Sequence, residues 1–143
     1  MSKAYEVSAI AKAGREGLVE TTEGSLSLYL ASPMAIGKKT EKNNPEQLFS
    51  AAYASCFSQA MAIVSKNAGF ELKETPIKST VELHADKETG FNIYAGIEAT
   101  LPTDIPHAKA VEIVKASHAM CPFSKLIKAD HFLFLKVNGV KIG

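Results

Sequence analysis

One uncharged stretch near the middle of the chain constrains the fold more than any other feature. Between Gln47 and Ser65 no side chain carries a formal charge. Large apolar side chains recur around the whole circumference of a helix over this stretch: Leu48, Phe49, Tyr53, Phe57, Met61, Ile63 and Val64. A helix that is apolar all round is expected to be buried on nearly every side. The sequence therefore predicts a long central helix enclosed by the rest of the protein.

Both ends of this helix carry local signals. Asn44 is a candidate N-cap, Pro45 suits the first helical position, and Gln47 stands where a capping box places a Glu or Gln. Gly69 follows the last residues of the pattern, as is common where a helix ends. We therefore predict a helix from Pro45 to about residue 68.

A stretch of this length could also span a membrane. Six polar side chains interrupt it, however: Gln47, Ser50, Ser55, Ser58, Gln59 and Ser65. The whole chain is 46% hydrophobic and 22% charged, as is typical of soluble globular proteins. We therefore favour a buried core helix and no membrane role.

Charge and length restrict the function classes further. The net charge is +1 and no run of Lys and Arg occurs, so nucleic-acid binding has no electrostatic support. The first residues lack the apolar segment of a secretory signal, so we expect a cytoplasmic protein. With 143 residues and no linker or repeat, residues 1–143 are expected to form a single domain.

The remaining elements are predicted from periodicity and turn residues. Alternating apolar residues indicate strands at 5–13, 18–22, 25–31, 77–85, 91–101 and 132–137. Helical spacing predicts a second helix over 107–120, and Pro122 starts a short one to about residue 129. A polar loop is expected over 32–43. The fold class is α+β, with an antiparallel sheet packed on the long buried helix and on a second helix.

The two cysteines occupy different positions on these elements. Cys56 lies in the middle of the long helix, and Cys121 lies at the start of a short one. Helix N-termini favour thiolates, so dipole reasoning alone nominates Cys121 as the reactive thiol. Free cysteines are also among the most buried residues, so both could be inert core side chains. In a reducing compartment, the pair leaves redox chemistry, metal binding or packing open.

Two charged residues and one histidine complete the list of candidates. Arg15 lies in a turn flanked by glycines, where it could face a thiolate or simply be solvated. Glu46 lies in the first turn of the long helix, where it could serve a site or only stabilise the helix dipole. His118 and Cys121 have an H-x-x-C spacing, but structural zinc sites usually show two such pairs. We therefore predict no metal.

Four short segments together resemble a known family. They are GREG at 14–17, NPEQLF at 44–49, YASCF at 53–57 and CPFS at 121–124. With the order of strands and helices, they make the chain similar to the OsmC/Ohr family, thiol-dependent peroxidases for organic hydroperoxides. The arginine of GREG looks like the organic hydroperoxide resistance (Ohr) branch. The tail SKLIKADHFLFLKV, and a loop over 34–43 without a glycine-rich run, look more like the OsmC branch.

The resemblance implies roles for the candidates. Cys56 would be the peroxidatic thiol and Cys121 the resolving one, with Arg15 and Glu46 organising the site. It also implies an intertwined homodimer, an organic hydroperoxide as substrate and a dithiol reductant of the lipoyl type, without a bound cofactor. Two other functions remain open from the residues alone. One is a binding module for an apolar ligand with non-catalytic cysteines, and the other is a redox-sensing protein.

Physical chemistry refines these expectations. Lowering the pKa of a thiol increases the thiolate fraction but reduces its nucleophilicity, so the net gain in rate is small. Arg15 is therefore predicted to act mainly by holding the peroxide and stabilising the departing alkoxide. Glu46 precedes Cys56 by ten positions, about 15 Å along a helix, so these two cannot touch within one chain. Glu46 could instead orient Arg15, or reach the site of a partner chain.

Overall fold

The computed structural model describes residues 1–32 and 42–143, and the chain separates into two compact units. The N-terminal unit is Met1–Leu48 and the C-terminal unit is Phe49–Gly143. That both form the single domain predicted over 1–143 stays a prediction. Most of the predicted loop over 32–43 lies outside the described residues.

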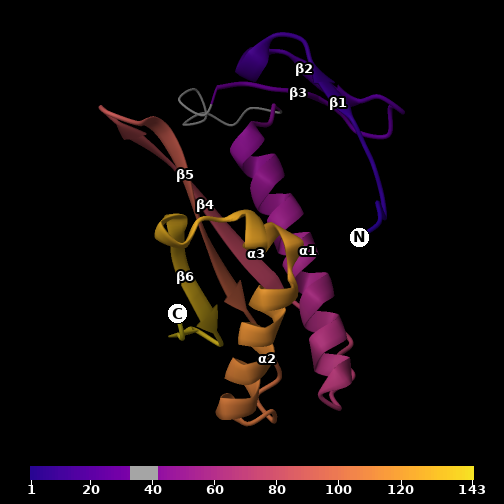
Figure 1. The fold of residues 1–143 in the computed structure, drawn as a ribbon, viewed down its shortest axis with the longest axis vertical. Helices are drawn as coiled ribbons and strands as arrows, with labels where there is room; N and C mark the ends of the chain where they lie inside the picture. Colours follow the sequence, from indigo (N-terminus) through magenta and orange to yellow (C-terminus); the bar gives the residue numbers. More distant parts are fainter. Residues whose placement is uncertain (33–41) are drawn as a thin grey trace. The chain divides into compact units, whose positions relative to one another are not determined.

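The N-terminal unit contains a small antiparallel sheet. Its strands are β1 (Ala9–Ala11), β2 (Leu18–Thr21) and β3 (Ser27–Tyr29), in the order β1-β2-β3 (Figure 1). The 3-10 turn η1 (Gly14–Glu16) joins the first two strands. The three predicted strands are confirmed, but β1 is shorter than the predicted 5–13 because β2 pairs only with Ala9, Ile10 and Ala11.

Helix α1 (Pro45–Asn67) begins in the N-terminal unit and continues through the C-terminal one. At its start, the Gln47 N–H donates to Asn44 Oδ1 at 2.8 Å, and the Asn44 N–H donates to Gln47 Oε1 at 3.0 Å. This reciprocal pair is the predicted capping box. At the other end, Gly69 has φ +91°, a conformation that a side chain would strain. The predicted start and end of the helix are confirmed.

The predicted burial of α1 on nearly every side is wrong for the single chain. Side chains at intervals of four residues are exposed: Gln47, Ala51, Ser55, Gln59 and Ile63. The buried side chains are Tyr53, Phe57, Ala60, Met61 and Ser65. The C-terminal unit by itself therefore covers one side of the helix and leaves a stripe open along the other. Among the described residues α1 is the one helix long and apolar enough to cross a membrane, a weak indication because core helices of soluble proteins pass the same test.

The C-terminal unit is built on a four-stranded sheet in the order β4-β5-β6-β7. Its strands are β4 (Ile77–Asp86), β5 (Gly90–Ala99), β6 (Phe132–Val137) and β7 (Val140–Lys141). The first two form the predicted hairpin, and β6 has the predicted limits. The short β7, which follows the Asn138–Gly139 turn, was not predicted from the sequence.

One strand pair departs from the antiparallel expectation. Strands β5 and β6 run parallel, whereas β4 with β5 and β6 with β7 are antiparallel. Between β5 and β6 the chain forms α2 (His107–Met120), α3 (Pro122–Leu126) and the 3-10 turn η3 (Ala129–His131). A crossover of this length brings the next strand back in the same direction. Helix α3 ends before residue 129, its predicted end, and η3 follows it.

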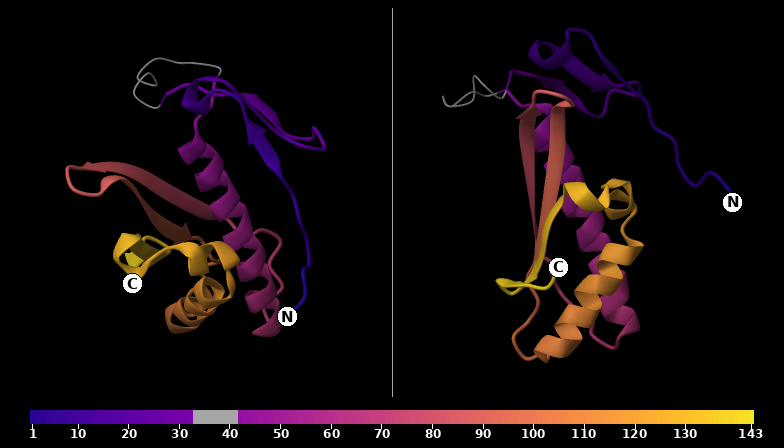
Figure 2. Two further views of the ribbon diagram at one scale, coloured as in Figure 1. Left: turned by 45° about the horizontal axis from the view of Figure 1, so that its top comes forward. Right: turned by 60° about the vertical axis from the view of Figure 1, so that its left-hand side comes forward.

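Helices α1 and α2 lie on the same face of this sheet (Figure 2). A single buried cluster fills the space between them, with Tyr53, Phe57 and Met61 from α1, Ile113 and Val114 from α2, and Ile97 and Val137 from the strands. Cys121 belongs to the same cluster. The α+β class, with a sheet packed on the long helix and on a second helix, is thus confirmed.

Candidate functional site

The two cysteines face each other inside the C-terminal unit. The Cys121 thiol donates a hydrogen bond to Cys56 Sγ across 3.5 Å, and both cysteines are free. Cys121 is fully buried, and Cys56 is partly exposed. Figure 1 shows the reason: α3 lies beside the middle of α1. The sulfur atoms are therefore close enough to form a disulfide after a small movement.

Pro122 explains why Cys121 reaches this position. The Cys121 N–H donates to the Ser117 carbonyl at the end of α2, and the backbone then becomes extended, with φ −63° and ψ 119°. Pro122 cannot donate a hydrogen bond to continue α2, but it suits the first position of α3. Cys121 thus occupies the predicted N-cap position of α3, at the corner between two helices.

The surroundings of Cys56 act on its pKa in opposite directions. Burial raises the pKa of the Cys56 thiol because it disfavours the thiolate, and a backbone N–H donated by Phe123 partly offsets this. The neighbouring Cys121 raises the pKa further. The thiolate is the nucleophile, and a raised pKa leaves little of it at neutral pH. Activation of Cys56 therefore calls for a positive group in addition to these contacts.

Aromatic rings surround this part of α1. Phe123 lies 6.2 Å from Phe49 and 6.4 Å from Tyr53, measured between ring centroids, and the rings of Phe123 and Tyr53 are stacked. Tyr53 also contacts Phe49 at 6.1 Å and Phe57 at 6.5 Å. Phe49 and Phe123 are partly exposed, so this aromatic cluster gives the neighbourhood of Cys56 an apolar surface.

A buried hydrogen bond lies next to the cysteine pair. The hydroxyls of Tyr53 and Ser124 are 2.8 Å apart. Tyr53 is 0% exposed and Ser124 is 6% exposed. Burial raises the pKa of Tyr53 to about 12, although the bond with Ser124 opposes this. From the sequence, Tyr53 was expected only to make the surroundings of Cys56 apolar, and neither Phe123 nor Ser124 was given a role. The available signal was their place within the YASCF and CPFS segments, where Tyr53 and Ser124 each lie three positions from a cysteine.

Arg15 and Glu46 meet inside the N-terminal unit. Arg15 Nη1 donates to Glu46 Oε2 at 2.7 Å, and Arg15 Nη2 lies 2.6 Å from Glu46 Oε1. This two-point pair lowers the pKa of Glu46 and raises that of Arg15, in both cases chiefly through the side-chain hydrogen bond. The Arg15 side chain is 43% exposed and that of Glu46 is 12% exposed. Arg15, the only arginine in the sequence, is therefore held in place rather than simply solvated.

The four predicted site residues thus form two pairs, Cys56 with Cys121 and Arg15 with Glu46. Each pair is complete within its own unit. That both pairs serve one site stays a prediction.

The H-x-x-C spacing of His118 and Cys121 does not lead to a ligand cluster. His118 packs on Phe132, and burial lowers the pKa of its imidazole. Its Nδ1 is buried without a hydrogen-bond partner within residues 1–32 and 42–143. Over the same ranges, no group of three or more His, Cys, Asp or Glu side chains could hold a metal ion.

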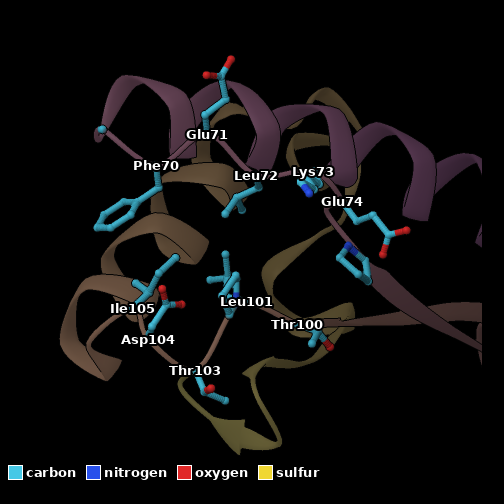
Figure 3. A pocket seen from close by; sticks show the side chains of 13 residues that line it. Phe70, Glu71, Leu72, Lys73, Glu74, Thr100, Leu101, Thr103, Asp104 and Ile105 are labelled. Carbon is cyan, nitrogen blue, oxygen red and sulfur yellow. The ribbon is translucent and has the colours of Figure 1, made fainter.

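A pocket of about 780 Å³ lies elsewhere in the C-terminal unit, between the segments 69–76 and 100–105 (Figure 3). Leu72 and Leu101 point toward one another inside it, whereas Glu71 points away. Neither cysteine lines this pocket, so it is separate from the thiol pair.

Comparison with known proteins supports one family throughout. The family model described as OsmC-like protein matches residues 37–132. An organic hydroperoxide resistance protein-like sequence from Mycoplasma pneumoniae is 45% identical over 143 residues, with 99% of this chain and 100% of the relative covered. The chain belongs to the OsmC/Ohr family.

Solved structures agree with this membership. The organic hydroperoxide resistance protein OhrB of Bacillus subtilis has a TM-score of 0.85 at 31% identity, covering 95% of this chain and 100% of that one. The OsmC organic hydroperoxide resistance protein from Legionella pneumophila has a TM-score of 0.83 at 35% identity, with 95% and 97% covered. The OsmC/Ohr fold therefore extends over nearly the whole chain.

Proposed function

We propose that this OsmC/Ohr protein is a cysteine-based peroxidase that protects against organic hydroperoxides by reducing them to alcohols. The Cys56 thiolate attacks the outer peroxide oxygen, the O–O bond breaks, and the alkoxide takes up a proton. Cys56 is left as a sulfenic acid, Cys–SOH. Cys121 then attacks the Cys56 sulfur, which forms the disulfide and releases water. A dithiol reduces the disulfide and is itself oxidised.

The observation that carries this proposal is the 3.5 Å distance between Cys56 Sγ and Cys121 Sγ. A disulfide requires an S–S distance of about 2.05 Å, so side-chain rotation with a small shift of α3 suffices. The partial exposure of Cys56 and the full burial of Cys121 suit a thiol that meets the peroxide and a thiol that resolves it. This favours the roles that the family resemblance implies, in which Cys56 attacks the peroxide and Cys121 resolves. It disfavours the helix-dipole argument, in which Cys121 is the reactive thiol.

Arg15 and Glu46 are proposed to supply the positive group that Cys56 needs. Glu46 contacts both terminal nitrogens of Arg15, Nη1 and Nη2, and so fixes the plane of the guanidinium. The other N–H donors of the guanidinium remain for a ligand. In this role Arg15 holds the peroxide and stabilises the negative charge of the departing alkoxide. The raised pKa of Cys56 among its own contacts supports the need for such a cation.

A homodimer is proposed as the working form. The exposed stripe on α1 ends in the apolar Ile63 and otherwise consists of small or polar side chains, among them Ala51 and Ser55, which allow a second helix to approach closely. An uncharged stripe of this kind is unusual for a solvent-facing helix and suits burial by a second copy. We place the dimer in the cytoplasm, where a dithiol of the lipoyl type can return the disulfide to two thiols.

The partly exposed rings of Phe49 and Phe123, packed on the buried Tyr53 and Phe57, favour bulky organic substrates over hydrogen peroxide. Each methylene group buried on binding contributes about 0.8 kcal/mol, so three or four give a preference of about a hundredfold. Equal or better kcat/KM with hydrogen peroxide would contradict this specificity.

Steady-state assays test the proposal. We expect multiple turnovers of an alkyl hydroperoxide with dihydrolipoamide, and slower turnover with thioredoxin. Peptide mapping after one equivalent of oxidant should find an intramolecular Cys56–Cys121 disulfide. Oxidation without turnover would instead indicate a redox sensor. Thiols that do not react at all would indicate a binding module with cysteines in its core.

A further inference from the structure

Two contacts join α1 and α3 side by side. One is the contact between the sulfur atoms of Cys56 and Cys121, at 3.5 Å, and the other is the hydrogen bond between Tyr53 and Ser124, at 2.8 Å. Tyr53 lies three positions before Cys56, and Ser124 lies three positions after Cys121. Three positions are about one helical turn, so the two contacts form neighbouring links between the same elements.

Phe123 strengthens the same connection. Its backbone N–H donates to Cys56, and its ring stacks on Tyr53 with an angle of 24° between the planes. Tyr53 therefore contacts α3 through both its ring and its hydroxyl. One turn of α1 thus receives most of the described polar and aromatic contacts of α3.

Helix α3 depends on such contacts for its position. It has only five residues, and a helix this short is not stable in water without tertiary contacts. The Cys121–Pro122 corner separates it from the last hydrogen bond of α2. Where the Cys121 sulfur lies is therefore decided largely by what holds α3 against α1.

We propose that Tyr53 and Ser124 are positioning residues for the second chemical step, in which Cys121 attacks the oxidised sulfur of Cys56. This inference rests on the proposed peroxidase function. In that step the bond between the two sulfur atoms forms and the S–O bond of Cys56 breaks. The proton lost by Cys121 and the departing hydroxide become water. The oxidising equivalents come from the hydroperoxide of the first step.

The chemistry itself explains why a second link is needed. The hydrogen bond from Cys121 to Cys56 is made by the reduced pair, and it ends when Cys121 loses its proton to attack the oxidised sulfur. The bond between Tyr53 and Ser124 is not consumed at any stage. It can therefore keep Cys121 within reach while Cys56 is a sulfenic acid. Because burial raises the pKa of Tyr53 to about 12, the phenol also stays neutral at physiological pH and keeps its proton for the bond.

Single-turnover kinetics on the full-length protein test this role. Tyr53→Phe and Ser124→Ala each remove one hydroxyl. The protein is mixed with one equivalent of an alkyl hydroperoxide, and the sulfenic acid is detected by trapping with dimedone. We expect the rate of this first oxidation to stay within about twofold of wild type. Formation of the disulfide should slow about tenfold, the size expected for one buried hydrogen bond. With excess oxidant, more Cys56 should reach the sulfinic acid.

The double variant Tyr53→Phe/Ser124→Ala separates positioning from stability. A single change leaves one buried hydroxyl unpaired, whereas removing both can be nearly neutral for stability. We expect the melting temperature of the double variant to lie closer to wild type than those of the single variants. Its rate of disulfide formation should stay as slow as in the single variants. Matched controls are Ser117→Ala, a buried serine bonded within α2, and Tyr94→Phe, a tyrosine stacked on His131.

The outcomes are distinguishable. A double variant that forms the disulfide at the wild-type rate overturns the positioning role, and so does an equal slowing of both chemical steps in the single variants. Either result leaves the peroxidase function intact. If the wild-type protein itself forms no Cys56–Cys121 disulfide with the hydroperoxide, the proposed function and this inference both fail.

Discussion

Arg15 binds both carboxylate oxygens of Glu46, a residue 31 positions further along the chain. This pairing holds a guanidinium in one orientation at the middle residue of the short 3-10 turn η1. A planar group held on one side can present its other donors to a ligand without losing much freedom on binding. The pair therefore has the properties of a preformed anion-stabilising group, and the first prediction concerns its removal.

Arg15→Ala is expected to lower kcat/KM for an alkyl hydroperoxide by about 2–4 kcal/mol in transition-state terms, by analogy with the loss of an oxyanion-hole donor. Arg15→Lys should also be poor, because a point charge cannot hold two oxygens in a planar fork. In both variants the apparent pKa of Cys56, measured from the pH dependence of iodoacetamide alkylation, should rise. The control is Lys12→Ala, an exposed cation nearby in the sequence. Near-normal rates in Arg15→Ala would mean that Arg15 takes no part in the reaction.

Mixed dimers should reveal which chain supplies Arg15. Glu46 and Cys56 are ten positions apart on α1, about 15 Å along the helix axis, which disfavours contact within one chain. We therefore expect mixtures of Arg15→Ala and Cys56→Ser chains that have been unfolded and refolded together to be more active than Arg15→Ala alone, although Cys56→Ser alone is inactive. If the mixtures are no more active than Arg15→Ala alone, Arg15 serves the cysteine of its own chain.

Glu46→Gln should remove an acid-dependent part of the stability. The hydrogen bond with Arg15 lowers the pKa of Glu46 in the folded state. The stabilisation is thus present above the ordinary pKa of a Glu, about 4.3, and is lost as the pH falls through the lowered value. We expect wild type to exceed Glu46→Gln by about 0.5–1 kcal/mol at pH 7, and this difference to vanish at strongly acidic pH. Urea unfolding at several pH values measures it, with Glu16→Gln as the control. A difference that does not change with pH would contradict the ion-pair explanation.

The two cysteines should give different phenotypes. Cys56→Ser should abolish turnover, because the nucleophile is lost. Cys121→Ser should still undergo one oxidation but leave Cys56 open to the sulfinic and sulfonic acids. Mass spectrometry of intact protein after one and ten equivalents of hydroperoxide distinguishes these states. Retained activity in Cys56→Ser, together with loss of the first oxidation in Cys121→Ser, would mean that the roles are reversed.

Tyr53 should make the fold sensitive to alkaline pH. Burial raises its pKa from 10.0 to about 12. A group with a raised pKa contributes its full stabilisation below the unfolded value, about 10, and loses it as the pH rises through 12. The loss should approach ~2–3 kcal/mol at the upper end. Tyr53→Phe lacks the titrating hydroxyl, so its unfolding free energy should fall less between pH 10 and 12 than that of wild type or Tyr94→Phe. Parallel curves for Tyr53→Phe and wild type would contradict the assignment.

Local sequence determined where most elements begin and end. Asn44, Pro45 and Gln47 define the start of α1 because their hydrogen bonds close within four residues. The β4–β5 hairpin and the Cys121–Pro122 corner are equally local, since each depends on turn residues or on the missing N–H of a proline. The family resemblance likewise came from short segments of the sequence.

Tertiary structure alone decided which of these elements meet. Arg15 pairs with Glu46 across 31 positions, Cys56 with Cys121 across 65, and Tyr53 with Ser124 across 71. No local rule fixes contacts over such separations, because they depend on how the sheet and helices pack together. The parallel pairing of β5 with β6 and the exposed stripe of α1 have the same origin. The apolar side chains of α1 show from the sequence alone that the helix must be buried. Only the packed structure shows which of its sides are buried and which residues bury them.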